Sequence, residues 1–372
     1  MGDKIQGIVE GICKSMNSLD CVKAVVGFDG FVDCILRVVK NKEVTGKSQY
    51  FESMREFGEY LIDKSGKSCS LELNEVATKI GGNMPIMANT LGSLGIKTDC
   101  IGAMGYPDVD PLFKTMSGSC TLHTIAKPGY TTALEFNDGK VMLGQMDSLN
   151  RLTWDMVKDY LGMENIRNMF LKSNLICMVN WSELDCTTSI WEGILEDVMP
   201  HHTPNKNQIM FFDLSDCSKR SRKEILQALE LIKRFSTNFK VVFGLNENEA
   251  RLVYNALKDN ADTCDIGLIG DTIYSAMGID VIVIHPVKCS MAWTASGIFK
   301  AQTLFVNKPK ISTGGGDNFN AGLCAGLLMG LDPEASLIMA NSTSAYYVKN
   351  GCSPSLLQLV DFIKENSSAF AV

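Results

Sequence analysis

The sequence predicts an α/β fold in which a mostly parallel sheet is covered by helices on both faces and a small β-sheet projects as a lid. Short apolar runs alternate with helical patterns along most of the 372 residues, which is typical of a parallel sheet buried on both faces. Two regions replace this rhythm with polar–apolar alternation, which indicates strands with one exposed face. Because 45% of the residues are hydrophobic, the chain can form a substantial core.

The predicted strands are the apolar runs, and the predicted helices lie between them. Strands are expected at residues 24–28, 98–103, 175–179, 209–214, 240–244 and 281–284. Helices are expected at residues 84–95, 187–198, 223–235 and 248–257. Each helix follows one strand and precedes another, as a crossover connection between parallel strands requires.

The lid is predicted from two excursions, at about residues 35–79 and 121–143. The second contains alternating residues 131–136, an Asn-Asp-Gly-Lys turn and a further apolar run, which together indicate a hairpin. A helix at 50–62 is expected inside the first. Because no Pro- or Ser-rich linker separates these regions, residues 1–372 are predicted to form a single domain.

Composition excludes several classes of function. A net charge of -7 and the lack of basic runs interleaved with aromatic residues argue against nucleic-acid binding. Thirteen cysteines without a C-x-x-C pair, with only four histidines, indicate neither a zinc site nor a disulfide framework. No apolar stretch approaches the roughly 18 residues of a membrane span, and the N-terminus lacks a signal-peptide core. A cytoplasmic protein is therefore expected.

The most informative segment runs from Ser312 to Gly322 and places three glycines directly before Asp317 and a helix expected from Asn318 to about Gly330. Glycines leave backbone N–H groups unshielded, and the helix adds the positive end of its dipole. The segment therefore predicts an anion site beside a carboxylate, as phosphoryl transfer requires. The alternative is a simple turn followed by tight packing.

Four motifs in the same order resemble the ribokinase-like (PfkB) carbohydrate kinase family, over roughly residues 22–365. They are Gly27-Phe28-Asp29-Gly30-Phe31-Val32-Asp33, Gly81-Gly82-Asn83, Asn246-Glu247-Asn248-Glu249, and the glycine triplet with Asp317, followed by Ala340-Asn341 on a late helix. Some features are also similar to the ADP-dependent sugar kinases of the same superfamily.

The resemblance implies a doubly wound fold and transfer of the terminal phosphoryl group of a nucleotide to a sugar hydroxyl. Its family roles fall on residues of this chain as follows: Asp317 as general base; Gly314, Gly315 and Gly316 as the anion hole; Asp29, Asp33, Gly82 and Asn83 at the substrate; Asn246, Asn341 and Ser312 at the nucleotide; and Glu249 at Mg²⁺ through water. ATP is the expected donor, and ADP is the alternative.

Several of these residues also have a structural interpretation. Asn246 and Glu249 have the spacing of a capping box, and both roles can hold together. Asp29 could brace the turn around Gly30, and Asn341 could serve tight helix packing. Asp317 could serve merely as a cap for the helix that follows it, and the Gly82–Asn83 pair could be an ordinary helix N-terminus.

The sequence departs from the family pattern at the nucleotide loop, where residues 284–289 lack the expected glycines and contain a proline. Ile311 also replaces the family's first Asp, which puts a monovalent-cation site in doubt. A catalytically inactive sugar sensor therefore stays open. So does a nucleoside kinase, since Phe31, Tyr130 and Phe136 could stack on a base. His285 is interpreted as structural, and exposed lid edges predict a possible homodimer.

Overall fold

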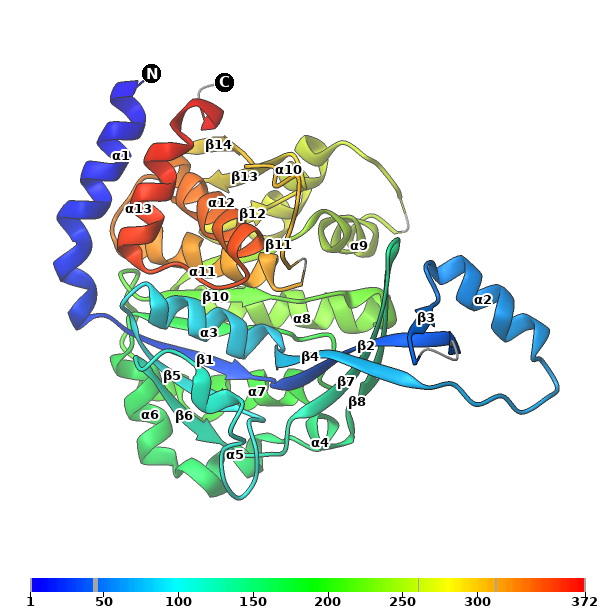
Figure 1. Ribbon diagram of the computed structural model, residues 1–372. Helices are drawn as coiled ribbons and strands as arrows, with labels where there is room; N and C mark the ends of the chain where they lie inside the picture. The colour runs from blue at the N-terminus through cyan, green and yellow to red at the C-terminus, as the bar shows by residue number, and fades with distance from the viewer. Residues whose placement is uncertain (1, 43–45, 260, 312, 371–372) are drawn as a thin grey trace.

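The protein is described by a computed structural model that covers residues 2–42, 46–259, 261–311 and 313–370. Nine strands of this described part form the main sheet, in the order β14-β13-β12-β11-β10-β9-β1-β5-β6 (Figure 1). The strands are β1 (Lys23–Phe28), β5 (Lys97–Gly102), β6 (Cys120–Thr124), β9 (Leu175–Met178), β10 (Ile209–Asp213), β11 (Lys240–Leu245), β12 (Val281–Ile284), β13 (Cys289–Thr294) and β14 (Gly297–Gln302). Pairing is parallel from β12 to β6 and antiparallel for β12–β13 and β13–β14.

Helices cover both faces of this sheet, as predicted. One face packs on α5 (Trp154–Leu161), α6 (Met163–Lys172), α7 (Thr187–Asp197), α8 (Arg222–Phe235), α9 (Glu247–Leu257) and α10 (Ile266–Met277). The other packs on α1 (Gly2–Ser15), α3 (Asn83–Ser93), α11 (Gly315–Leu328), α12 (Pro333–Asn350) and α13 (Leu356–Glu365). Alternate residues of each strand enter the two cores, so Phe212 packs on one face and its neighbour Phe211 on the other.

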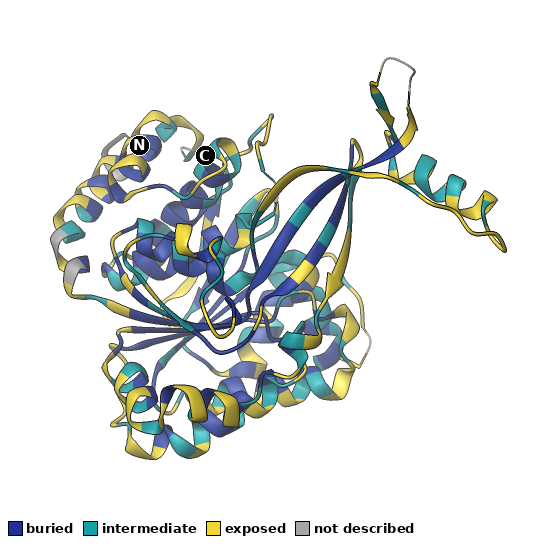
Figure 2. Ribbon diagram, turned by 60° about the horizontal axis from the view of Figure 1, so that its bottom comes forward, coloured by how far each residue is buried: buried dark blue, intermediate teal, exposed yellow. Residues whose placement is uncertain are grey.

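The lid is a second sheet of five strands in the described residues, in the order β3-β2-β7-β8 with β4 also paired to β2. Its strands are β2 (Phe31–Lys42), β3 (Ser48–Tyr50), β4 (Leu73–Gly81), β7 (Gly129–Phe136) and β8 (Gly139–Gln145). Helix α2 (Met54–Asp63) closes a small core against it, where Phe57 stacks on Phe136 at 5.4 Å. Figure 2 shows the lid projecting from the body as an arm.

Some predicted boundaries differ from the observed ones. The second excursion was expected from residue 121, but β6 pairs in parallel with β5, so residues 120–124 belong to the main sheet. Helix α2 begins at Met54 rather than at residue 50 because Ser53 caps it by accepting from the Glu56 amide. The short elements are α4 (Asp147–Asn150) and the 3-10 turns η1 (Met16–Cys21), η2 (Phe113–Thr115), η3 (Met199–His201), η4 (Cys217–Lys219) and η5 (Ser367–Phe370). Within the described residues, no helix is long and apolar enough to cross a membrane.

Candidate active site

The glycine triplet forms the start of α11, three residues earlier than predicted. Gly314 is the N-cap, with the positive φ of 87° that glycine adopts readily, and Gly315 and Gly316 lie in the first turn. Backbone N–H groups of a first turn have no partner within the helix. A Cβ on Gly314 would lie 2.9 Å from Tyr347 Oη, whereas one on Gly316 would meet nothing closer than His285 Cε1 at 3.8 Å. The amides of the triplet therefore have no partner within the helix, and the space beside Gly316 is the most open of the three.

Asp317 lies in the same first turn and is part of a cluster of carboxyl groups. Part of the residue's surface is exposed, but its carboxyl group is largely removed from solvent. Burial raises its pKa well above the usual value, and the charges of Asp213, Asp29 and Glu249 raise the pKa further. Asp29 directly follows β1 and Asp213 ends β10, whereas Glu249 and Asp317 lie in the first turns of α9 and α11. The four carboxyl groups are therefore close enough for their charges to act on Asp317.

Asp29 organises the start of α3. Its Oδ2 accepts from the Asn83 amide at 2.8 Å and from Asn180 Nδ2 at 2.6 Å, and its Oδ1 accepts from the Met84 amide at 2.7 Å. The carboxyl group is fully buried, which raises its pKa to about 6. Gly82, with φ 92°, fits closely, because a Cβ there would lie 2.8 Å from Asp29 Oδ2. Asp29 thus holds the segment from Gly82 to Met84 rather than the turn around Gly30.

Asp33 projects from the face of the lid that turns toward α11. It lies on β2 opposite Lys79 of β4 and Thr131 of β7, so the three side chains share one face. Burial raises the Asp33 pKa, while a hydrogen bond from Thr131 and the charge of Lys79 lower it in part. Lys79 Nζ in turn donates to Thr313 Oγ1 at 2.8 Å, directly before Gly314. This contact joins the lid to the glycine loop.

Asn246 and Glu249 form the capping box that their spacing allowed. Asn246 Oδ1 accepts from the Glu249 amide at 2.9 Å, and Glu249 Oε2 accepts from the Asn246 amide at 2.9 Å. Asn246 Nδ2 also donates to Glu249 Oε1 at 2.6 Å. Both carboxyl oxygens are therefore engaged, and burial together with Asp213 raises the Glu249 pKa well above its usual value. The described residues include no group of three His, Cys, Asp or Glu side chains that could hold a metal.

A cleft of about 570 Å³ lies between the glycine triplet, the loops that follow β12 and β14, and helix α12. It is lined by Asn246, His285, Pro286, Val287, Thr303, Leu304, Phe305, Val306, Pro309, Gly315, Gly316, Phe319, Asn341, Ser344, Ala345 and Val348. Its size and its largely apolar walls are those of a small-molecule site. Two of its predicted members, Asn246 and Asn341, are therefore brought together with the triplet, while Ser312 lies outside the described residues.

Asn341 fixes one wall of this cleft through its side-chain amide. Its Nδ2 donates to Ser290 Oγ at 2.9 Å and to the Gln302 carbonyl oxygen at 3.0 Å, which ties α12 to β13 and β14. The predicted tight helix packing is also present, because a Cβ on Gly322 of α11 would lie 2.9 Å from Ala340 Cα.

Sequence reasoning missed several polar residues around the site. Asn180 has a positive φ of 58° and holds Asp29, and Asn320 Nδ2 donates to Asp213 at 2.7 Å. Burial, with the charges of Asp317 and Asp33, raises the Tyr347 pKa to about 12. Asn180 and Tyr347 have no motif around them, although a polar residue shortly after a strand could have indicated Asn180. Asn320 lies within the segment from Ser312 to Gly322, but its spacing did not indicate that it contacts Asp213.

His285 was interpreted as structural, and its environment agrees with that. Its ring stacks on Phe319 at 4.5 Å between centroids, and its backbone amide donates to the Leu245 carbonyl at 2.9 Å. Burial lowers its pKa to about 4, so the ring is neutral at pH 7. It forms part of the wall of the cleft beside Gly316.

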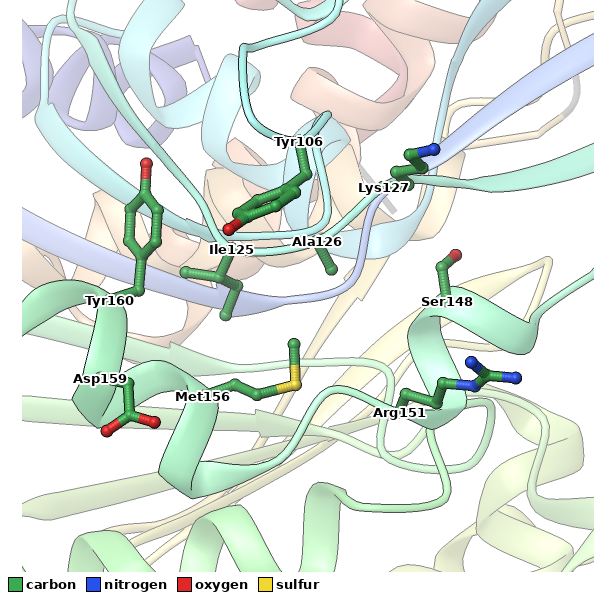
Figure 3. A pocket seen from close by; sticks show the side chains of 9 residues that line it. All are labelled: Tyr106, Ile125, Ala126, Lys127, Ser148, Arg151, Met156, Asp159 and Tyr160. Carbon is green, nitrogen blue, oxygen red and sulfur yellow. The ribbon is translucent and has the colours of Figure 1, made fainter.

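A separate pocket of about 540 Å³ shares no lining residue with this cleft (Figure 3). It is formed by the loops after β5 and β6 together with α4 and α5, and is lined by Tyr106, Ile125, Ala126, Lys127, Ser148, Arg151, Met156, Asp159 and Tyr160. None of these is a predicted site residue, so the reaction is not assigned to this pocket.

Comparisons with known proteins identify a matching family and several proteins of the same fold. The model of the prokaryotic ketohexokinase family matches residues 4–366. A ketohexokinase from Haloferax volcanii is 24% identical over 92% of this chain and 91% of its own. A ribokinase from Thermotoga maritima, at 15% identity, covers 92% of this chain and 99% of its own with a TM-score of 0.63.

An Arabidopsis thaliana ribokinase, whose structure holds ribose and ATP, has 14% identity and a TM-score of 0.61, and the match covers 92% of this chain and 98% of its own. At such identities the structures show the shared fold alone, while the family match extends over nearly the whole chain. The chain therefore belongs to the prokaryotic ketohexokinase family and is a carbohydrate kinase, which transfers a phosphoryl group from a nucleotide co-substrate to a sugar.

Proposed function

We propose that this kinase transfers the terminal phosphoryl group of ATP to a hydroxyl group of a ketohexose, with Asp317 as the general base. The observation that carries the proposal is the position of Asp317 in the first turn of α11, beside the free amides of Gly315 and Gly316. The match to the ketohexokinase family over residues 4–366 supports a ketohexose as the acceptor.

Asp317 and the glycine triplet have separate tasks in the reaction. Asp317 accepts the proton of the acceptor hydroxyl while that oxygen forms a bond to the terminal phosphorus of the nucleotide. The bond from phosphorus to the bridging oxygen breaks, and its electron pair leaves with the nucleoside diphosphate. The amides of Gly314, Gly315 and Gly316 stabilise the charge on the moving phosphoryl oxygens, as an anion hole does. The raised Asp317 pKa makes this carboxylate a stronger base.

Asp33 and Asn83 are proposed to bind the sugar, from the lid and from the start of α3 respectively. A carboxylate accepts hydrogen bonds from two hydroxyl groups, and sugars that lack those hydroxyls leave it unpaired. Asp29 has both oxygens engaged within the protein, so its role is to position the Gly82–Asn83 segment. Direct contact of the sugar with Asp29 would have to use the remaining acceptor position of Oδ1, on a carboxyl group that is fully buried.

The cleft beyond the triplet is proposed to hold the nucleotide. Asn341 shapes its wall, and Ser312 is proposed to contact the phosphates. Because both Glu249 oxygens are engaged, the residues fit a magnesium ion held mainly by phosphate oxygens and waters, with Glu249 orienting a water. Bound Mg²⁺ would supply positive charge to the phosphate oxygens. ATP is the proposed donor, and ADP is the alternative.

The lid geometry disfavours the nucleoside alternative. Tyr130 pairs with Val32, so its ring lies on the opposite face of the sheet from Asp33. Phe136 is buried against Phe57 of α2. Of the three aromatic residues proposed to stack on a base, only Phe31 shares the face of Asp33.

Turnover tests the proposal and separates it from an inactive sensor. The purified protein is given Mg-ATP or Mg-ADP with fructose, other ketohexoses, aldohexoses and nucleosides, and nucleotide consumption is measured. We expect ketohexose-dependent consumption that Asp317→Asn lowers by at least about 1000-fold. Equal turnover in the variant would contradict the role of Asp317, and a sensor would bind a sugar without turnover. Dimerisation through the lid and a cytoplasmic location stay predictions.

A further inference from the structure

Lys79 is a lid residue without a role in the steps proposed for Asp317 and the glycine triplet. It lies on β4 opposite Asp33, the proposed sugar ligand, and on the same face of the lid. Its ammonium group donates to Thr313 Oγ1 at 2.8 Å, and Thr313 directly precedes the triplet. The cation is therefore located between the sugar side and the phosphate side of the site.

The surroundings of Lys79 are unusual for a lysine. Its side chain is half-buried, although lysines mostly lie in solvent. Burial and the nearby Lys140 lower its pKa, and the charges of Asp33 and Glu135 offset this only in part. Lys140 is paired with Glu135 at 3.0 Å, whereas Lys79 donates a hydrogen bond to the neutral hydroxyl group of Thr313. An ammonium held this way is available for an anion.

The charged groups that act on Asp317 are all acidic. Asp213, Asp29 and Glu249 all raise the Asp317 pKa through their negative charge. A phosphoryl group that enters this region therefore needs positive charge from the nucleotide side, where Mg²⁺ is proposed, and also from the acceptor side. Lys79, whose ammonium group contacts the residue directly before the triplet, is the candidate for the second.

We propose that Lys79 binds the oxygens of the phosphoryl group during its transfer, from the acceptor side, and that Thr313 holds the ammonium in place until then. Lys79 gives up no proton; the hydroxyl proton still goes to Asp317, and the bridging oxygen still leaves with the nucleotide. This inference rests on the proposed function and adds a charged group that the lid brings to the reaction.

The test compares variants of the whole protein with the best ketohexose and Mg-ATP. We expect Lys79→Met to lower kcat by roughly 100-fold while KM for the sugar changes by less than about threefold, since single groups that stabilise transition-state charge contribute on this scale. Lys79→Arg should stay within about tenfold of the wild type because it keeps the charge. Thr313→Val should lower kcat by less than about tenfold because the ammonium remains.

Lys140→Met is the matched control, since it removes another ammonium from the same face of the lid without touching Thr313. It should lower kcat by less than about threefold. An equal loss in Lys140→Met would assign the effect to overall lid charge, and an equal loss in Thr313→Val would assign it to the loop contact alone. Either result overturns the inference.

Two further measurements, thermal stabilisation by the sugar and turnover by the wild type, distinguish a loss of folding from a loss of catalysis. Thermal stabilisation by the sugar should persist in Lys79→Met, because Asp33 and Asn83 are intact. A wild type that turns over no sugar contradicts the proposed function and this inference together. An active wild type with an equally active Lys79→Met contradicts only this inference.

Discussion

The carboxyl group of Asp33 occupies the space that a side chain on Gly81 would take. A Cβ on Gly81 would lie 2.5 Å from Cγ and from both carboxyl oxygens of Asp33. The two residues belong to neighbouring lid strands, β4 and β2. Glycine at this position therefore lets Asp33 lie against the lid while its carboxyl group keeps one fixed direction.

Gly81→Ala should therefore move Asp33 and weaken sugar binding. The Asp33 carboxyl group is the end of a short side chain that can rotate, so we expect folding to persist. Because a shift of about 1 Å in a positioning group can cost roughly 100-fold, KM for the sugar should rise at least about tenfold. Steady-state kinetics of Gly81→Ala and Asp33→Asn check this. A variant with unchanged KM would contradict the role of Asp33.

Gly314 and Gly316 should respond differently to the same added methyl group. In Gly314→Ala the φ of 87° is strained, and the Cβ would approach Tyr347 Oη to 2.9 Å. We expect a loss of about 1–3 kcal/mol in the free energy of unfolding. Gly316→Ala meets no atom closer than 3.8 Å, so its stability should be unchanged or slightly higher.

The activity of the same pair completes this prediction. The Gly316 methyl group would enter the cleft beside the transferred phosphoryl group, so kcat of Gly316→Ala should fall by roughly 100-fold in a stable protein. Urea unfolding and steady-state kinetics are measured on both variants. If Gly316→Ala were fully active, the anion hole would not involve this part of the first turn.

Much of this site could be predicted from the sequence because its signals are local. The triplet, Asp317 and the following helix are contiguous, and strands buried on both faces appear as apolar runs such as residues 281–284. The edge hairpin β13–β14 was not predicted, since Ser290 and Lys300 interrupt its apolar residues.

The role of Lys79 could not be predicted because it depends on long-range pairing. Its place opposite Asp33 follows from the register of β4 on β2, which shifts between Ile35 and Leu36. A shift of one residue would turn Lys79 to the other face of the lid. Its contact with Thr313 spans 234 residues of sequence, and no local pattern indicates such a contact.

Asn341→Ala should destabilise the protein more than it weakens nucleotide binding. The substitution removes both hydrogen bonds from Nδ2 and leaves the Gln302 carbonyl oxygen without this partner. We expect the free energy of unfolding to fall by about 1–3 kcal/mol. KM for ATP should change by less than about threefold, because the amide hydrogens already bind protein groups. A large rise in KM with unchanged stability would instead indicate direct contact with the base.

The buried carboxyl groups should make the protein without ligands more stable at mildly acidic pH. The pKa of Asp29 is raised from 3.8 to about 6, and the pKa values of Asp33, Asp213, Glu249 and Asp317 are also raised. At a pH between the unfolded-state and folded-state pKa values of such a group, the folded protein holds more protons than the unfolded protein. The free energy of unfolding therefore falls as pH rises. For Asp29 alone, the shift of its pKa from 3.8 to about 6 corresponds to about 3 kcal/mol in the free energy of unfolding over the full titration.

Urea unfolding between pH 5 and pH 7.5 measures this effect, in the absence of nucleotide, Mg²⁺ and sugar. We expect the free energy of unfolding to increase as pH is lowered from 7 toward about 5. Asp138→Asn, which changes an exposed lid carboxyl group, serves as the control and should keep the same slope. Bound Mg²⁺ would favour the ionised carboxylates, so adding Mg-ATP should flatten the slope. A stability that instead declined steadily from pH 7 to pH 5 would mean that these carboxyl groups remain ionised in the folded protein and that the cluster around Asp317 is more hydrated than its burial indicates.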